Sequence, residues 1–246
     1  MTLSLPGSRH RAAVAFVFVT VLIDILSFGI IIPVLPHLVE QLAGGGIALA
    51  ALWLGLFGTL FAAIQFVFSP VQGALSDRFG RRPVILLSNL GLGIDFLFMA
   101  LVNTLPLLLL GRAISGATAA SFTTANAYIA DVTPPEKRAA SFGMLGAAFG
   151  IGFIIGPALG GLLGSIDVRA PFWAAAVLAL TNFCYGWFIL PESLPPERRS
   201  KRFDWGHANP FGSLLMLRRY HGVFGLASVV LLSNLAHYVL QSVFVL

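Results

Sequence analysis

Charged side chains are scarce in this sequence. Lysine, arginine, aspartate and glutamate together make up 10% of its 246 residues, against 57% hydrophobic residues, and the mean hydropathy is +0.89. A water-soluble domain of this length needs a polar surface that such a composition cannot supply. The composition therefore excludes a soluble globular protein and predicts one that is embedded in a membrane.

Cysteine is nearly absent, and the sequence patterns of common catalytic sites are missing. The single cysteine, Cys184, excludes a disulfide framework within the chain and a thiolate metal site. Because it lies in an apolar run, we expect it to be a small packing residue. There is no H-E-x-x-H, no G-x-S-x-G and no cysteine-histidine cluster, and GIGFIIG resembles a dinucleotide loop only superficially because no strand precedes it. We therefore expect no enzyme, no metal site and no cofactor.

Long apolar runs are what the sequence has instead. Seven of them are long enough to cross a bilayer as helices: residues 12–35, 47–71, 84–102, 105–130, 140–163, 170–190 and 223–246. Arg9 and Arg11 precede the first run as in a secretory signal, but the run is too long for one and contains Asp24. We therefore predict an all-α membrane protein that keeps this first span.

The basic residues alternate between the connections that join these runs. They fall before the first run and in every second connection, whereas the other connections hold only Arg169. Because lysine and arginine stay on the cytoplasmic side, we predict a cytoplasmic amino terminus, an outward-facing segment 36–46 and a multi-pass protein of the inner (plasma) membrane. The net charge of +5 is then a topology signal, so the expected partner is the lipid bilayer and not nucleic acid. The alternating set comprises Arg9, Arg11, Arg78, Arg81, Arg82, Lys137, Arg138, Arg198, Arg199, Lys201, Arg202, Arg218 and Arg219.

The segment GALSDRFGRR, residues 73–82, is expected as an inner loop between the second and third spans. Gly73 lies one turn before Asp77 on the same helical face, and a loop that only set topology would need neither residue. The glycine permits close helix approach, and the carboxylate can face the positive end of another helix. The segment resembles the G-x-x-x-D-R-x-G-R-R loop of the major facilitator superfamily of secondary transporters, through Gly73, Asp77, Arg78, Gly80, Arg81 and Arg82.

Two further segments carry the same resemblance. GRAISGATAA places Arg112 one turn before Gly116, similar to the superfamily's R-x-x-x-G feature. The fifth run repeats glycine every fourth residue and holds GPALGG, which resembles the signature of the antiporter branch. Such a ridge lets helix backbones pack closely. Its members are Gly146, Gly150, Gly152, Gly156, Pro157, Gly160 and Gly161.

The likeness to the tetracycline/proton antiporters of that superfamily extends over nearly the whole chain. Its landmarks, in order, are IIPVLP, GALSDRFGRRPV, Asp95, AYIADVTP, APFWAAA and LPES. The resemblance implies twelve spans in two six-helix halves with the pathway between them. It also implies proton-coupled drug efflux and tetracycline resistance, with a proton gradient as the energy source and a small-molecule substrate carried free or as a metal chelate.

Three ionisable residues lie far from any connection and are the candidates for proton coupling and substrate handling: Asp24, Asp95 and Arg112. At 1.5 Å per residue, Asp24 and Asp95 lie about 18 and 16 Å from the inner ends of their spans, and Arg112 lies about 10 Å from an outer end. In a core about 30 Å thick, this depth allows either aspartate to pair with Arg112. The resemblance implies transport roles for all three. The weaker cavity candidates, which can equally be helix-helix hydrogen bonds, are Gln65, Asn126, Tyr128, Asn182 and Tyr185.

The predicted organisation is a six-span amino-terminal transporter half over 1–190, a cytoplasmic linker with an interfacial helix over 191–222, and a seventh span over 223–246. The resemblance therefore predicts a missing carboxy-terminal half, which would provide the partner surfaces of the Asp77 loop and of the glycine ridge. Two alternatives remain beside drug efflux. One is a non-transporting fragment or a half that needs a complementary chain; the other is a superfamily carrier of another small metabolite.

Overall fold

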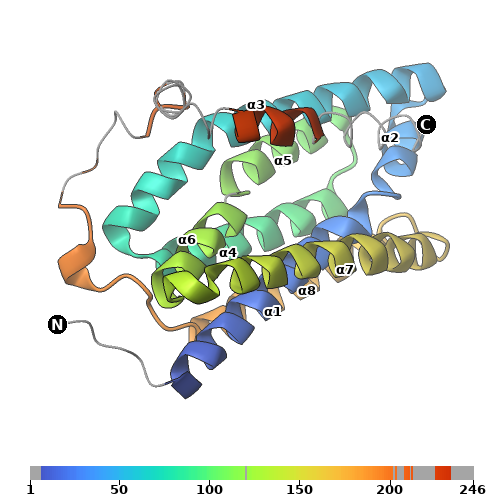
Figure 1. The fold of residues 1–246 in the computed structure, drawn as a ribbon. Coiled ribbons are helices and arrows are strands. Elements are labelled where there is room, and N and C mark those ends of the chain that lie inside the picture. Colours follow the sequence, from blue (N-terminus) through green and yellow to red (C-terminus); the bar gives the residue numbers. More distant parts are fainter. Residues whose placement is uncertain are drawn as a thin grey trace.

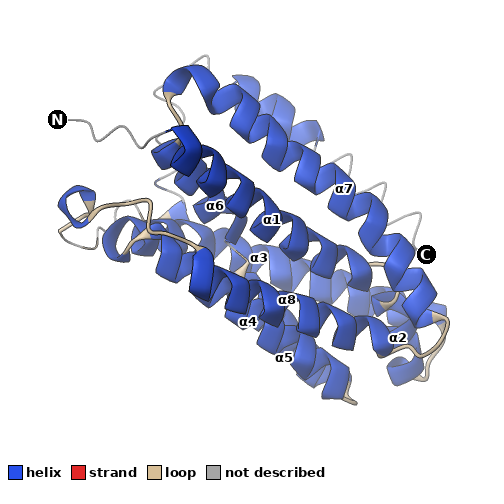
Figure 2. Ribbon diagram, turned by 90° about the horizontal axis from the view of Figure 1, so that it is seen from below, coloured by secondary structure: helices blue, strands red, loops and turns tan. Residues whose placement is uncertain are grey.

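The computed structural model describes residues 7–119, 121–201, 203, 208–210, 212 and 225–233. Within these residues all regular secondary structure is helical (Figure 2). The α-helices are α1 (Gly7–Ile31), α2 (Leu35–Ala43), α3 (Ile47–Phe79), α4 (Arg81–Leu101), α5 (Leu105–Thr118), α6 (Ser121–Val132), α7 (Arg138–Gly164) and α8 (Ala170–Ile189). Two 3-10 turns, η1 (Pro135–Lys137) and η2 (Pro196–Arg198), lie in the connections.

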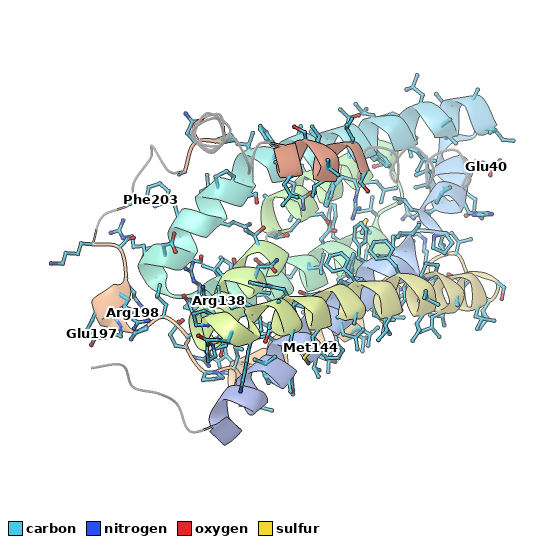
Figure 3. All side chains as sticks on the ribbon, viewed as in Figure 1. Glu40, Arg138, Met144, Glu197, Arg198 and Phe203 are labelled. Atoms are coloured by element: carbon cyan, nitrogen blue, oxygen red, sulfur yellow. The ribbon has the colours of Figure 1, made fainter. Side chains whose placement is uncertain are left out.

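The helices form a bundle whose long members run back and forth between two ends (Figure 1). The start of α1, the α3–α4 turn and the segment after α8 lie at one end, called here the α3–α4 end. Helix α2 and the α7–α8 connection lie at the other, the α2 end. Arg138, Glu197 and Arg198 lie at the α3–α4 end and Glu40 at the α2 end (Figure 3).

Within the described residues, six stretches are long and apolar enough to cross a membrane, and they correspond to the first six predicted runs. The predicted all-α membrane fold is thereby confirmed. Most of the predicted seventh span lies outside the described residues, although 225–233 are helical. The predicted interfacial helix, placed at 209–220, likewise falls almost wholly outside them.

The second and third spans are joined by a single residue and not by the longer loop that the apolar runs predicted. Helix α3 continues to Phe79 and α4 begins at Arg81, so that Asp77 lies within α3. Gly80 makes the turn with φ at 108°, a left-handed value that favours glycine. The difference arises because hydropathy marks the part of a helix that is apolar and not the residue at which the helix ends.

Two other segments have helices whose ends the apolar runs did not show. The outer connection predicted at 36–46 is largely helix α2, which has Pro36 in its first turn and ends at Gly44 with φ at 61°. The fourth predicted span is divided into α5 and α6. Close to this break, Thr118 Oγ1 donates to Ile114 O and Gln72 Nε2 donates to Ala117 O, so side chains bond carbonyls where the helix is interrupted.

The glycine ridge of α7 has a packed side and an open side. A Cβ added to Gly156 would lie 2.7 Å from Gly29 Cα, and one added to Gly160 would lie 2.0 Å from Ile30 O. This side, which includes Gly152, therefore needs glycine because the backbone of α1 lies against it. The prediction that the partner surface of the ridge lies in a second half is therefore wrong for this side, whose partner is α1. On the open side, Gly146, Gly150 and Gly161 have no atom within 4 Å of an added Cβ.

Arg169, the exception among the basic residues, closes the end of a helix. Its Nη1 donates to Ala100 O at 2.7 Å, and its Nη2 donates to Asn103 Oδ1. Ala100 lies in the last turn of α4, where free carbonyls favour a cation. A structural contact thus accounts for this arginine at the α2 end.

The single cysteine does not pack as predicted. Cys184 is exposed on α8. The two buried apolar clusters lie elsewhere: one joins α2, α3, α4, α5 and α8, and the other is built mainly from α1, α6 and α7. An apolar run predicts only that its residues avoid water. In a membrane helix such residues either pack inside the bundle or face lipid, and the run does not distinguish the two.

Candidate functional site

Asp95 of α4 and Arg112 of α5 form an ion pair inside the bundle. Arg112 Nη2 lies 3.1 Å from Asp95 Oδ2, and the side chains of Asp95 and Arg112 are 0% and 8% exposed. Ser115 Oγ donates to the same carboxylate oxygen and accepts from Arg112 Nη2 at 3.1 Å. Three side chains from two helices therefore form one closed network. Sequence reasoning missed Ser115, although it follows Arg112 by nearly one helical turn.

The environment of this pair is apolar. The Arg112 guanidinium lies 5.8 Å from the centre of the Phe61 ring of α3, and its Nη2 also reaches Met99 Sδ at 3.3 Å. Asp95 Oδ1 and Arg112 Nε are buried without a hydrogen-bond partner. Each charge thus depends on the other, because a buried ion that loses its only counter-ion is strongly destabilising.

Asp24 of α1 is buried against neutral amides. Asn182 Nδ2 of α8 donates to Asp24 Oδ1 at 2.8 Å and to Thr20 O at 2.9 Å. In the amide orientation that satisfies both ends of the Asn89 side chain, its nitrogen lies 3.1 Å from Asp24 Oδ2 and its oxygen accepts from Asn182 Nδ2. We call Thr20, Asp24, Asn89 and Asn182 the amide cluster. It joins α1, α4 and α8.

Helix α4 separates the two buried carboxylates. It carries Asn89 toward Asp24 and Asp95 toward Arg112, and residues six apart in a helix point in directions about 120° apart. The depth estimate allowed either aspartate to pair with Arg112, and the structure pairs Asp95. Asn89 was missed by sequence reasoning, although an asparagine within an apolar span is itself a signal of an interior contact.

The weaker cavity candidates do not gather at one place. Asn182 belongs to the amide cluster, whereas Tyr128 is buried and its hydroxyl donates to Pro191 O at 3.0 Å. Tyr185 stacks on Phe16 with the ring centres 4.4 Å apart. Gln65 on α3 and Asn126 on α6 are half-buried. Tyr128 thus bonds to the segment after α8, and Tyr185 packs against α1 through a ring contact.

At the α3–α4 end, Arg81 is the centre of a charged group. Its Nη2 lies 2.6 Å from Asp77 Oδ1, its Nε lies 3.1 Å from Asp131 Oδ2 of α6, and its Nη1 donates to Ser76 Oγ at 2.6 Å. Arg78 and Arg82 each lie over an aromatic ring, of Phe79 and Trp187 respectively. Of these three side chains, Arg81 is the one with carboxylate partners in the described part of the chain. Asp131 was missed, although it lies in the landmark AYIADVTP.

Glu192, in the segment after α8, closes the start of α4. Its Oε1 accepts from the backbone N–H of Arg81 at 2.9 Å and of Arg82 at 3.5 Å. The free N–H groups and the positive end of the helix dipole favour a carboxylate there. A Cβ at Gly80 would lie 2.2 Å from Glu192 Oε2, so the glycine also makes room for this cap. The LPES landmark contains this glutamate, but the sequence did not show that its partners are the N–H groups at the start of α4.

The backbone after Glu192 also contacts the end of α3. Ser200 N donates to Asp77 O at 2.9 Å, and Arg199 Nη2 lies 3.6 Å from Glu192 Oε2. The segment 191–200 therefore joins the end of α3 to the start of α4. We call Asp77, Arg81, Asp131, Glu192 and Arg199 the loop cluster.

Comparison with known proteins identifies the family of this chain. A sequence profile of the Major Facilitator Superfamily matches residues 17–246. The chain belongs to the major facilitator superfamily. The resemblance drawn from the motifs is thereby confirmed.

Members of the superfamily with similar sequences include tetracycline resistance proteins. The class C protein of Escherichia coli is 44% identical over 78% of this chain and 48% of its own length, and the class B protein of Escherichia coli is 42% identical over 71% and 43%. The bovine major facilitator superfamily domain-containing protein 10 is 33% identical over 78% of this chain and 47% of its own length.

Solved structures that resemble this superfamily member include transporters. The human organic anion transporter MFSD10 superposes with a TM-score of 0.72 at 29% identity, covering 81% of this chain and 51% of that chain. The peptide transporter POT, at 15% identity and a TM-score of 0.65, shares the fold alone. The chain thus spans about half the length of the relatives it matches.

Proposed function

We propose that the complete protein encoded by this gene exports a drug or another small organic molecule in exchange for protons, with a tetracycline as the leading substrate. The observation that carries the proposal is that two carboxylates, Asp24 and Asp95, are buried within apolar membrane-length helices, where ionisable groups are costly. The names of the tetracycline resistance proteins with up to 44% identity support the choice of substrate.

The proposed coupling uses the two carboxylates at different moments. Asp95 can release Arg112 only when a proton or another cation replaces the guanidinium, because arginine itself does not lose its proton. Opening the site to one side of the membrane would change the solvation of these groups and hence their proton occupancy. Proton binding on one side and release on the other would then favour opposite orientations of the two halves.

A second candidate function is the transport of an organic anion. The human structure with the TM-score of 0.72 is named as an organic anion transporter, and this chain is 29% identical to it. In that case Arg112 would be the residue that attracts the substrate, and its pairing with Asp95 would be the competing interaction.

Transport by proteoliposomes that contain the complete protein tests the proposal. We expect a tetracycline to accumulate inside when the lumen is acid, and we expect an uncoupler to abolish the accumulation. Omitting Mg²⁺ would show whether the metal chelate is the transported form, and a panel of organic anions would test the second candidate. Anion uptake without tetracycline uptake would exclude the first candidate.

The 246-residue chain, prepared alone, tests whether one half suffices. We expect no uptake from it, and we expect uptake to return when the remainder of the complete protein is supplied as a second chain. Uptake by this chain alone would contradict the need for a complementary half.

The membrane orientation is part of the proposal. Single cysteines at Gly45 and Ser200, in a chain with Cys184 replaced by serine, should react with an impermeant maleimide from opposite sides of the membrane, Ser200 from the cytoplasmic side. Gly45 lies between α2 and α3, at the α2 end, and Ser200 lies in the segment after α8, at the α3–α4 end; Figure 1 shows these elements at opposite ends of the bundle. Labelling of both from one side would contradict the bundle orientation, and labelling from reversed sides would contradict a cytoplasmic amino terminus.

A further inference from the structure

Of the three side chains in the interior network, Ser115 is the one that can both donate and accept a hydrogen bond. Ionised Asp95 has acceptors only, and Arg112 has donors only. In this structure Ser115 Oγ donates to Asp95 Oδ2 and accepts from Arg112 Nη2 at 3.1 Å, and the serine is 1% exposed. A change of protonation at Asp95 can therefore be matched by turning the serine hydroxyl hydrogen, with no heavy atom of the serine moving.

The helix backbone around Ser115 is packed closely against its neighbours. A Cβ added to Gly116 would lie 2.7 Å from Phe61 O of α3. One added to Gly111 would lie 3.0 Å from Asp95 Oδ1 of α4. Because α5 is held on both sides of Ser115, the short serine side chain stays beside the carboxylate, whereas the long arginine side chain can change rotamer.

A proton on Asp95 Oδ2 can take the place of the guanidinium in this network. Arg112 Nη2 donates both to Asp95 Oδ2 and to Ser115 Oγ. When the arginine moves away, the serine oxygen regains a free lone pair. The acid O–H on Oδ2 can then donate to Ser115 Oγ, since these two oxygens are already hydrogen-bonded to each other.

The serine hydrogen then needs a new acceptor, which its own helix supplies. A serine or threonine within a helix can bond the carbonyl four residues earlier, which for Ser115 belongs to Gly111. Two side chains of this protein make that bond: Ser27 Oγ to Ile23 O at 2.7 Å, and Thr118 Oγ1 of α5 to Ile114 O at 3.0 Å. Both protonation states of Asp95 are therefore compatible with a bonded serine.

Arg112 is the charged group that the described residues place beside Asp95. Helix α4 packs on α3, α5, α6 and α8. The other ionisable side chains of these five helices are exposed or have partners elsewhere: Asp77 and Asp131 bind Arg81, Arg78 and Arg82 lie over Phe79 and Trp187, Tyr128 bonds to Pro191 O, Tyr185 stacks on Phe16, and Cys184 is exposed. A proton on Asp95 thus competes with this one arginine.

We propose that Ser115 is the positioning residue of Asp95, and that its hydroxyl changes from donor to acceptor when a proton replaces Arg112 on the carboxylate. The inference rests on the proposed proton coupling. The proton comes from the acid side of the membrane, converts the carboxylate to the acid, and returns to water when the arginine pairs with the carboxylate again. Asp95 keeps a hydrogen-bond partner throughout, so the arginine can move without leaving this buried group alone.

Infrared spectroscopy of the complete protein in detergent tests the bond itself. On acidification, the Asp95 carboxyl should give a C=O stretching band that is absent from Asp95→Asn. In Ser115→Ala we expect this band at a higher frequency, because a carboxylic acid absorbs at a higher frequency when its O–H has no acceptor. The matched control is Ser27→Ala, which removes a buried hydroxyl that bonds its own helix and should leave the band in place. A wild-type protein without an Asp95 band, or a band that does not move in Ser115→Ala, overturns the proposal.

Two transport assays on the complete protein separate this role from a structural one. Proton-driven accumulation needs proton uptake and release, whereas exchange of labelled for unlabelled substrate needs only the movement of loaded carrier. We expect Ser115→Ala to lower accumulation by about ten-fold, the equivalent of one lost hydrogen bond to a buried charge, with exchange nearly unchanged. Equal loss in both assays, or no loss in either, overturns the proposal.

Ser115→Thr guards against an alanine variant that fails to insert. Threonine keeps a hydroxyl on the same carbon, so we expect it to accumulate substrate and to show the Asp95 band at its wild-type frequency. A threonine variant that exchanges substrate, yet accumulates no more than Asp95→Asn, overturns the proposal. Absence of proton-driven accumulation in the wild-type protein would instead overturn the proposed function, and the infrared band would still decide the role of Ser115.

Discussion

Charged side chains have different exposure and different numbers of partners in the bundle interior and at its α3–α4 end. In the interior, Asp95 and Arg112 are 0% and 8% exposed and each has one counter-ion. At the α3–α4 end, Arg81 binds Asp77 and Asp131 at once, and Asp77 is half exposed. A buried pair cannot lose a member without leaving an unscreened charge, whereas a hydrated cluster with several partners can. Single substitutions of charged residues should therefore lower the stability of the protein more in the interior than at the α3–α4 end.

Breaking the interior pair should give the largest effect on stability. Arg112→Leu leaves Asp95 buried with Ser115 as its remaining partner, and we expect a loss of about 3–5 kcal/mol in the free energy of unfolding. Denaturant unfolding in detergent measures it. The double variant Arg112→Leu with Asp95→Leu removes both charges and should be closer to the wild type. A double variant as unstable as the single one would mean that volume, and not charge, dominates at this site.

The two buried carboxylates should differ when each is neutralised. In the complete protein we expect both Asp24→Asn and Asp95→Asn to abolish proton-driven accumulation with insertion intact. Asp95→Asn should also destabilise the protein by about 1–3 kcal/mol, less than Arg112→Leu, because the asparagine oxygen can still accept from Arg112 although the counter-ion is lost. Asp24→Asn should cost less, since neutral amides surround it. If both variants showed the proton-coupled transport of the wild type, the two aspartates would have structural roles only.

At the α3–α4 end, the cap of α4 should have an intermediate effect. Gly80→Ala strains a backbone with φ at 108° and pushes on the Glu192 carboxylate, so we expect a loss of about 1–2 kcal/mol. Gly73→Ala is the matched control, because an added Cβ there meets no atom within 4 Å and alanine favours a helix. Unfolding of the two variants under the same conditions checks the difference. Equal stability of both would contradict a structural role for the cap.

The sequence predicted the features that depend on local composition. Six spans followed from apolar runs, and the burial of Asp24, Asp95 and Arg112 followed from their depth. The pairing did not follow, because it depends on which helices touch and which way α4 faces. The role of Glu192 was hidden for a similar reason, since its partners at the start of α4 lie more than one hundred positions away in sequence. Asn89 was missed although Asn126 and Asn182, which are also neutral residues within apolar runs, were among the candidates.

Asp77 should show the smallest effect on stability and a clear effect on transport. Asp77→Asn removes one of two carboxylates from Arg81, and the surviving contact with Asp131, together with the half-exposed position of Asp77, limits the loss to about 0.5 kcal/mol. The backbone bond from Ser200 N to Asp77 O does not depend on the carboxylate. Positive-inside orientation counts lysine and arginine, so the topology should not change.

In the complete protein, the family resemblance implies that Asp77 contacts the second half in one conformation. Its loss should then alter the balance between inward-open and outward-open states by about 1–3 kcal/mol, a typical coupling energy, and transport should fall. In the 246-residue chain the same substitution should change little, because the contacting helix is not part of it. Cysteine accessibility on both sides of the membrane measures the balance, and vesicle uptake measures transport. Normal uptake by the full-length variant would reduce Asp77 to a minor partner of Arg81 and leave the topology signal as the role of this segment.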